Sequence, residues 1–255
     1  MAEVAPPAAG PPTARRQFEL QRTVDLPAGA LPVWRAIATG AGQQAWRFPA
    51  DDETPREVGD TLAGYRVVVW EPPHRLGLRA ETGDDWFEAV EYVVDGRDGD
   101  TSALDYRHSG VMVDDWEAEY DSLDQHTDFA LHTLAEYLAH FPGREAIYIG
   151  AQSSASLDVP EAFGLVRRAL GLPDDALEGD PIHIEVLGAA PIDGVIDYLR
   201  PQFVGVRSGV GLYRFFGRDA FGQPIALGHH LFDPRVDQLE TSAWGAWLDS
   251  LFVPT

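Results

Sequence analysis

Three side chains that can exchange protons lie on two predicted neighbouring strands. Tyr106 and His108 are two positions apart in the alternating stretch 101–110, so their side chains point to the same face of a strand. Glu88 lies in the preceding stretch, 85–95, which alternates in the same way. Histidine, tyrosine and glutamate in an apolar pocket are suited to general acid–base catalysis, because burial shifts their pKa values.

A structural role for the same three residues is the alternative. In that case Glu88 faces solvent, His108 bonds to a backbone carbonyl near the end of its strand, and Tyr106 belongs to the core. The sequence leaves open which face of the sheet is concave, so both interpretations stand at this point.

Three tryptophans are candidates for the wall of such a pocket: Trp46, Trp86 and Trp116. Tryptophan is more often part of a core or a pocket wall than a catalytic group. At the mouth of a cavity, aromatic side chains favour an apolar or aromatic ligand.

The stretch 116–141 has the spacing of one long helix, roughly 39 Å in length. Its large residues recur mostly at steps of three or four, which is typical of a helix with a single apolar face. These residues are Trp116, Tyr120, Leu123, Leu134, Leu138 and Phe141. Thr127 and Ala130 are small, which predicts room for a ligand along the segment formed by Leu123, Thr127, Ala130 and Leu134. The alternative is a helix that crosses close to a sheet.

The composition excludes several kinds of partner and chemistry. The chain of 255 residues carries a formal net charge of -22, from 41 acidic and 19 basic residues. A surface this negative repels nucleic acid and anionic lipid, so we expect neither as a partner. All basic residues are arginine, and cysteine is absent, which excludes a Schiff base, a thiolate nucleophile and a sulfur-ligated metal.

Known catalytic and cofactor-binding motifs are also absent from the sequence. The glycine-rich stretch 207–211 lies between two predicted strands and favours a hairpin turn over a phosphate site. His229 and His230 are neighbours in a predicted strand, so they face opposite sides of it, and the histidines show no ligand spacing. We therefore expect no cofactor and no metal site.

Membrane and export signals are missing as well. No apolar run approaches the ~20 residues that span a bilayer. The N-terminus lacks a basic region followed by an apolar core. We therefore expect no membrane association and a cytoplasmic location.

The order of the predicted elements determines where these residues lie. Residues 1–16 are rich in proline and alanine and are predicted to be a disordered tail. A strand (17–26), a short helix (30–39) and a turn that ends at Trp46 follow. Sequential strands with short turns then imply an antiparallel meander, closed by the long helix. These strands are residues 61–70, 75–80, 85–95 and 101–110.

A second half with the same order of elements begins after Pro142 and Gly143. It has a strand, a helix, a meander and a closing helix, which is shorter than that of the first half. The predicted elements are residues 146–159, 161–170, 182–187, 195–199, 203–207, 212–216, 225–232 and 236–252. The sequence therefore predicts one domain at 17–142 and a second, shorter domain at 143–255.

Two short sequence matches support an internal repeat. Residues 25–27 resemble residues 158–160, at the junction between the first strand and the first helix of each half. Residues 73–79 resemble residues 201–207, at the same point of the two meanders. The displacements of the two matches are similar, which indicates a duplication.

Several short motifs of the first half mark a known fold. They are residues 33–37 (VWRAI), Trp46, residues 71–76 (EPPHRL), residues 108–110 (HSG) and residues 131–141 (LHTLAEYLAHF). These motifs resemble the START-like, helix-grip superfamily known as SRPBCC, and most closely its branch related to the C-terminal domain of the Hsp90 ATPase activator. The resemblance covers about residues 17–141. Residues 51–59 depart from it, because the family usually has a glycine-rich strand where this chain is acidic.

The resemblance implies an α+β helix-grip fold: a curved antiparallel sheet wrapped around a long C-terminal helix, with a hydrophobic cavity between them, followed by a smaller copy. Members of the family bind lipids, hormones, polyketides or other apolar molecules, and some are cyclases or aromatases. We therefore expect a small hydrophobic or aromatic ligand in the cavity, with cyclase-like acid–base chemistry as a further hypothesis. The alternative is a non-enzymatic, co-chaperone-like protein that binds a macromolecular partner. A filled cavity and an exposed apolar patch would favour that alternative.

Overall fold

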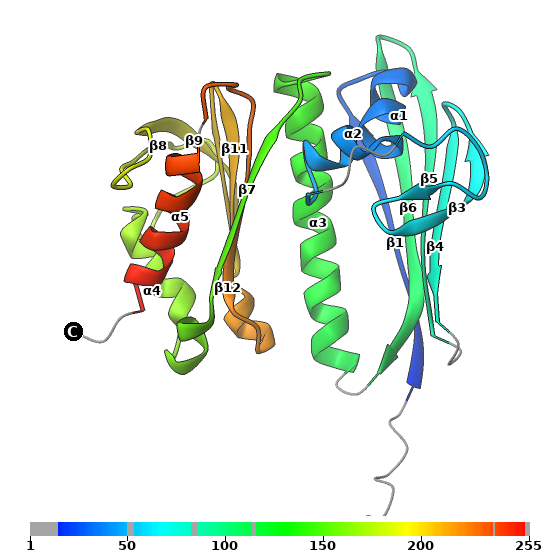
Figure 1. Cartoon of the computed structure of the whole chain (residues 1–255). Coiled ribbons are helices and arrows are strands. Elements are labelled where there is room, and N and C mark those ends of the chain that lie inside the picture. Colours follow the sequence, from blue (N-terminus) through cyan, green and yellow to red (C-terminus); the bar gives the residue numbers. More distant parts are fainter. Residues whose placement is uncertain (1–14, 50–53, 83–85, 114–115, 237, 253–255) are drawn as a thin grey trace, which may run out of the picture.

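Two antiparallel β-sheets stand on either side of one long helix (Figure 1). The computed structural model describes residues 15–49, 54–82, 86–113, 116–236 and 238–252. Each sheet has six strands, and a helix near the end of each half packs against it. The structure therefore confirms the predicted α+β, helix-grip class with a second copy of the same architecture.

The first sheet is a meander whose last strand pairs with the first strand of the chain. Its strand order is β1-β6-β5-β4-β3-β2, and every neighbouring pair is antiparallel. The elements of this half are β1 (Arg15–Leu26), α1 (Ala30–Ala38), α2 (Gly40–Gln44), β2 (Thr61–Leu62), β3 (Tyr65–Glu71), β4 (Arg75–Glu81), β5 (Phe87–Arg97), β6 (Thr101–Val113) and α3 (Trp116–His140).

The second sheet repeats this topology strand for strand, with the order β7-β12-β11-β10-β9-β8. The sequence match between residues 73–79 and 201–207 falls at equivalent turns, which are β3 to β4 and β9 to β10. The elements of this half are β7 (Ile147–Ser153), η1 (Ser154–Asp158), α4 (Ala162–Ala169), β8 (Pro181–Ile184), β9 (Ile192–Arg200), β10 (Phe203–Ser208), β11 (Gly211–Phe216), η2 (Arg218–Phe221), β12 (Ile225–Leu231) and α5 (Gln238–Ser250).

Two predicted strands differ from the observed elements. The stretch 61–70 is a tight hairpin of β2 and β3, because Ala63 and Gly64 both take a positive φ that turns the chain. The stretch 146–159 ends as a strand at Ser153 and continues as the 3-10 turn η1. The strand β1 begins at Arg15, and the rest of the predicted tail lies outside the described residues.

Helix α3 is buried on two faces. One face carries Leu131, Leu134 and Leu138 into the core of the first sheet. The other face places Phe129 against Phe203 of the second sheet, with ring centroids 5.3 Å apart. The sequence predicted only the first face, because the second is interrupted by polar residues.

The second sheet is consequently covered on both sides. Along β11, Tyr213 and Phe215 contact Trp244 of α5, whereas Arg214 and Phe216 point to α3. A strand covered on both faces reads as a continuous run of large residues rather than an alternating one, as β11 does.

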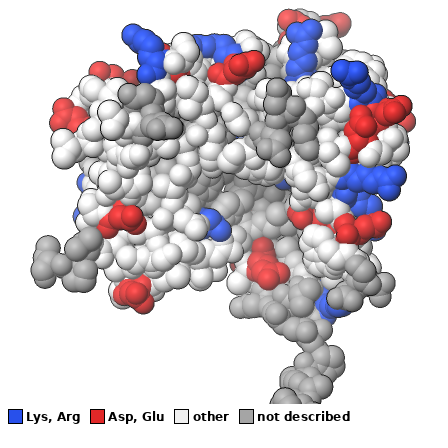
Figure 2. All heavy atoms as spheres, in the orientation of Figure 1, with Lys and Arg blue, Asp and Glu red and all other residues white. Residues whose placement is uncertain are grey.

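Among the described residues, no helix has the length and apolar character required to cross a bilayer. On the face shown in Figure 2, acidic and basic side chains lie mainly toward the edges, and few lie over the middle, where the two halves meet.

Candidate functional site

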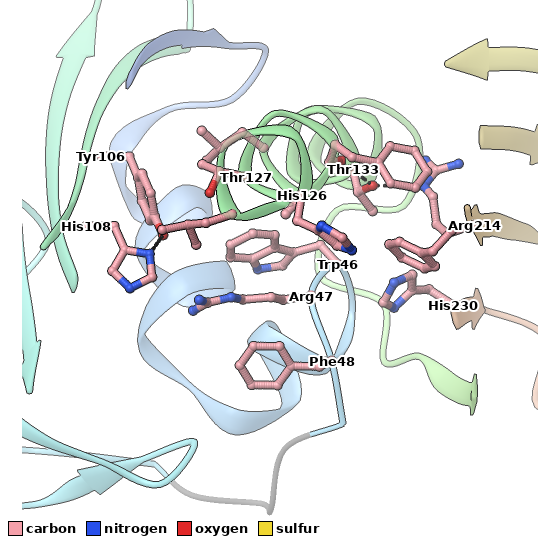
Figure 3. Close-up of a pocket in the computed structure, with 15 residues that line it drawn as sticks. Trp46, Arg47, Phe48, Tyr106, His108, His126, Thr127, Thr133, Arg214 and His230 are labelled. Carbon is pink, nitrogen blue, oxygen red and sulfur yellow. Dashed lines mark hydrogen bonds between the residues drawn. The ribbon is translucent and has the colours of Figure 1, made fainter. Parts of the chain in front are cut away.

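A cavity of about 220 Å³ lies between the two sheets, along α3 (Figure 3). The first half contributes residues of the α2 end and of β6, and the second half contributes residues of β11 and β12. The lining residues are Trp46, Arg47, Phe48, Tyr106, His108, Leu123, His126, Thr127, Phe129, Ala130, Leu131, Thr133, Arg214, Phe216 and His230. The cavity is thus shared by the two copies of the fold.

Most of the predicted ligand-facing residues line this cavity. Trp46, Leu123, Thr127 and Ala130 are among its lining residues. Leu134 is fully buried in the core of the first half instead.

The other two predicted wall residues lie elsewhere. Trp86 is half-buried just before β5 and does not line the cavity. Trp116 begins α3, and the Arg16 guanidinium lies 3.6 Å from the centroid of its ring.

The three predicted acid–base residues form one hydrogen-bonded chain. The Tyr106 hydroxyl lies 3.3 Å from Nδ1 of His108, and Nε2 of His108 lies 2.6 Å from Oε1 of Glu88. Their strands are neighbours in the sheet, and the face that carries them is the one that faces α3. His108 therefore bonds to a side chain rather than to the backbone carbonyl that the structural interpretation assumed.

The environment keeps the two ends of this chain in opposite protonation states. The bond from His108 lowers the pKa of Glu88 below its ordinary value, although partial burial of the carboxyl opposes this. Burial raises the pKa of Tyr106 above its ordinary value. At neutral pH the chain therefore runs from an ionised carboxylate to a protonated phenol.

The turn after α2 directs three consecutive residues, Trp46, Arg47 and Phe48, into the cavity. The Thr39 hydroxyl caps α2 by accepting a bond from the Gly42 amide at 3.0 Å. A Cβ at Gly42 would collide with the backbone carbonyls of α1, so only glycine allows this close packing of the two helices.

Trp46 and Arg47 are each fixed by one hydrogen bond to the first half. The Trp46 indole donates to the carbonyl of Ala36 at 3.0 Å. The Arg47 guanidinium donates to the Tyr92 hydroxyl at 3.2 Å, and Tyr106 and Glu88 are close enough to stabilise its charge. A guanidinium has five N–H groups, and this bond is the one that Arg47 makes to a described residue, so the others are available to a ligand.

Two histidines line the far side of the cavity, away from Tyr106 and His108 (Figure 3). Nδ1 of His126 lies 2.7 Å from the carbonyl of Ser122, and Nδ1 of His230 lies 2.8 Å from the carbonyl of Gln44. Burial lowers the pKa of His126 and lowers that of His230 to about 3.

Both rings are consequently neutral at pH 7. Because a carbonyl only accepts, the proton of each ring is on Nδ1, which leaves Nε2 as a hydrogen-bond acceptor. His230 shares β12 with His229, which faces Trp244 of α5 at a ring distance of 4.4 Å. The two neighbours thus face opposite sides of the sheet, as predicted.

Arg214 lines the cavity but is held by a separate polar cluster. It is 1% exposed, donates to both carboxylate oxygens of Asp197 at 3.0 and 2.8 Å, and donates to the Thr133 hydroxyl at 2.8 Å. Burial alone would raise the pKa of Asp197, but the charge of Arg214 and the bond from His132 outweigh it and hold that pKa below its ordinary value.

Three side chains of this cluster lie close enough together to be considered as metal ligands. Atoms of His132, Glu136 and Asp197 lie within 4.8 Å of one another. Arginine occupies both carboxylates, because Arg214 binds Asp197 and Arg207 binds Glu136 at 2.7 Å. This arrangement favours an ion-pair network over a metal site.

Sequence reasoning missed two sets of lining residues. Arg47 directly follows Trp46, and a polar residue next to a predicted wall residue was a usable signal. The wall formed by Arg214, Phe216 and His230 depends on contact between the halves, which no local pattern carries.

No family model matches this sequence, and no curated protein matches it. Solved structures do match. The di-domain ARO/CYC protein BexL from the BE-7585A biosynthetic pathway is 11% identical over 93% of this chain and 99% of that chain, with a TM-score of 0.42.

Two single-copy matches cover about half of this chain. Protein BH1534 from Bacillus halodurans is 18% identical over 48% of this chain and 96% of that chain, with a TM-score of 0.40. CalU16 from Micromonospora echinospora is 17% identical over 52% of this chain and 88% of that chain, with a TM-score of 0.37. At these identities the similarity concerns the fold alone, and the two helix-grip units of this chain are established by its own strand order.

Proposed function

We propose that the protein binds a small hydrophobic or aromatic molecule in the cavity between its sheets, and that Glu88, His108 and Tyr106 carry acid–base chemistry on it. The observation that supports this most directly is the hydrogen-bonded chain that ends at the cavity, at the Tyr106 hydroxyl. Apolar walls with a few convergent polar groups are typical of ligand sites.

The order of the chain suggests how a proton moves. Because the Glu88 carboxylate is ionised, Nε2 of His108 donates to it, which leaves Nδ1 to accept from the Tyr106 hydroxyl. Tyr106 can then give its proton to a ligand oxygen. Alternatively, His108 can take the Tyr106 proton while Glu88 stabilises the resulting imidazolium.

Arg47 supplies the complementary charge. Its unused N–H groups are available to an oxygen on which negative charge develops, such as the oxygen of an enolising carbonyl. Donors that are already oriented toward the position of the developing charge stabilise it effectively. The proposed chemistry is therefore proton transfer next to a carbonyl group of an apolar ligand, the step that a cyclase-like reaction requires.

The interaction-protein alternative predicted a filled cavity, and the structure contains an open one. We therefore propose the ligand-binding function alone. The likeness to the Hsp90 activator branch stays a prediction, as do the cytoplasmic location and the absence of nucleic-acid and membrane partners.

Blocking the cavity tests the binding proposal. Ala130→Phe places a ring in the cavity, whereas Ala139→Phe makes the same change on an exposed position of the same helix. Wild type and Ala139→Phe purified from the native host should carry a co-purifying apolar molecule in native mass spectrometry, and Ala130→Phe should not. A ligand at a hundred times its Kd stabilises a protein by about 2.7 kcal/mol, which a thermal shift detects.

Absence of any bound species in the wild type, together with no thermal shift across a panel of hydrophobic compounds, would contradict the binding proposal. Once a substrate is known, Tyr106→Phe and His108→Ala should both lower turnover. Unchanged turnover in both variants would exclude the acid–base chain.

A further inference from the structure

The cavity opens into a surface groove that contains an arginine, Arg218, which forms no ion pair with any carboxylate of the described residues. Phe48, Leu123, His126 and Phe216 line both the cavity and the groove, so the two spaces are continuous. The rest of the groove is formed by Glu119, Ser122, Tyr148, Arg218, Gln223, Ala226 and Leu227.

Arg218 begins η2 and is partly buried at this mouth. Its Nε donates to Oε1 of Gln223 at 2.9 Å, and its second bond goes to the same amide oxygen. Among the described residues no carboxylate forms an ion pair with it; Glu119 shares the groove but is exposed and unpaired with Arg218. A partly buried cation bonded only to a neutral amide is unusual in a chain with a net charge of -22.

The charge of Arg218 is directed toward the opening of the cavity. It acts on the His126 ring, which lines both spaces, and on the Tyr148 phenol in the groove. Burial lowers the pKa of Arg218 from its ordinary value, yet a guanidinium still stays charged at neutral pH. The mouth of the cavity therefore holds a charged guanidinium that no carboxylate of the described residues pairs with.

We infer that the ligand is an amphipathic acid, whose apolar body occupies the cavity and whose carboxylate binds Arg218 at the mouth. This inference rests on the proposed binding function and specifies its substrate class. The planar fork of a guanidinium matches a carboxylate in two parallel hydrogen bonds. Arg218 is the one arginine among the groove-lining residues, so the site neutralises a single negative charge more readily than a phosphate dianion.

A pair of matched probes separates the charge from the apolar body. We would titrate 1-naphthoate and 1-naphthamide into the full-length protein and measure both affinities by isothermal titration calorimetry. The variants are Arg218→Gln, Arg218→Lys, and Arg168→Gln as the control for net charge, since Arg168 is exposed on α4.

The wild type should bind naphthoate at least tenfold more tightly than naphthamide. Arg218→Gln should abolish this preference and leave the affinity for naphthamide unchanged, Arg218→Lys should restore part of it, and Arg168→Gln should match the wild type. A preference that persists in Arg218→Gln would overturn the inference, as would equal binding of both probes by the wild type. Failure of both probes to bind the wild type would overturn the proposed function as well.

Discussion

Each sheet presents a buried polar cluster to α3, and the two clusters differ in how far their hydrogen bonds are satisfied. On the second sheet, all three guanidinium nitrogens of Arg214 donate to protein oxygens, and Asp197 accepts from both Arg214 and His132. In the first half, Arg47 of the turn after α2 makes one bond to a described residue, and the Tyr106 hydroxyl of β6 faces the cavity.

This difference separates a cluster that holds the structure together from the one that we propose to bind a ligand. The bonds of Arg214 to Thr133, and of His132 to Asp197, join α3 to the second sheet, so the satisfied cluster connects the two halves. In the first half, the remaining N–H groups of Arg47 can find an acceptor only in a molecule that occupies the cavity. An unmet buried donor costs about 1–3 kcal/mol, so occupying the cavity lowers the free energy of the protein.

The largest expected effect comes from breaking the satisfied cluster. Asp197→Ala leaves the Arg214 guanidinium buried without its counter-ion, so the free energy of unfolding should fall by about 3–5 kcal/mol. Urea denaturation followed by tryptophan fluorescence measures the change. The double variant Asp197→Leu, Arg214→Met should recover most of the loss; equal losses in the single and double variants would contradict the ion-pair explanation.

Acid should destabilise the protein through the buried histidine of the same interface. His230 has a pKa of about 3 in the folded state, against an ordinary 6.5, because it is buried. Between those values the unfolded chain binds a proton that the folded chain does not, so stability decreases as pH falls. The decrease from pH 7 to 5 is about 2 kcal/mol for such a group.

Urea midpoints at pH 7, 6 and 5 test this expectation. His230→Gln should lose less stability over that range than the wild type, although His229, whose pKa also lies well below its ordinary value through burial, still contributes. His183→Gln is the control. Exposed His183 bonds to Asp193, which raises the pKa of His183, so removing this histidine cannot reduce the loss of stability at low pH. An unchanged slope in His230→Gln would contradict the prediction.

The sequence was sufficient for the fold and for the Tyr106–His108–Glu88 chain. Alternation placed Tyr106 and His108 on one face of their strand, and a meander pairs that strand with the preceding one, which carries Glu88. The same rule separated His229 from His230. These successes share one physical cause: in a strand, the side-chain period of two fixes direction without reference to the rest of the molecule.

The far wall of the cavity could not be derived in the same way. The second face of α3 carries His132 and Glu136, which resemble a solvated helix surface. Their partners Asp197 and Arg207 are more than 60 residues away in the sequence, with separations of 65 for His132 to Asp197 and 71 for Glu136 to Arg207. Polar residues reveal burial only once their partners are known.

Two threonines on α3 allow a matched test of satisfied and open bonds. The Thr133 hydroxyl donates to the Phe129 carbonyl and accepts from Arg214, each at 2.8 Å. Thr133→Val should therefore lower the free energy of unfolding by about 1–2 kcal/mol. Thr127 lines the cavity, where water can replace the bond between its hydroxyl and that of Tyr106. Thr127→Val should therefore cost less than about 1 kcal/mol, measured by the same urea denaturation. Equal losses of stability in Thr133→Val and Thr127→Val would contradict the distinction between the Arg214 cluster and the open cluster at the cavity.

The smallest expected effect on stability is that of Tyr106→Phe. The change keeps the ring against Tyr92, with centroids 5.4 Å apart in the wild type, and removes one hydroxyl whose partner, Nδ1 of His108, is at the cavity. Water in the cavity can replace that bond, so the free energy of unfolding should change by less than about 1 kcal/mol. Affinity for a ligand whose oxygen bonds to Tyr106 should nevertheless fall about tenfold, since a lost bond of about 1.4 kcal/mol corresponds to that factor. A large loss of stability with unchanged affinity would show instead that the Tyr106–His108–Glu88 chain is a structural cluster like that of Arg214.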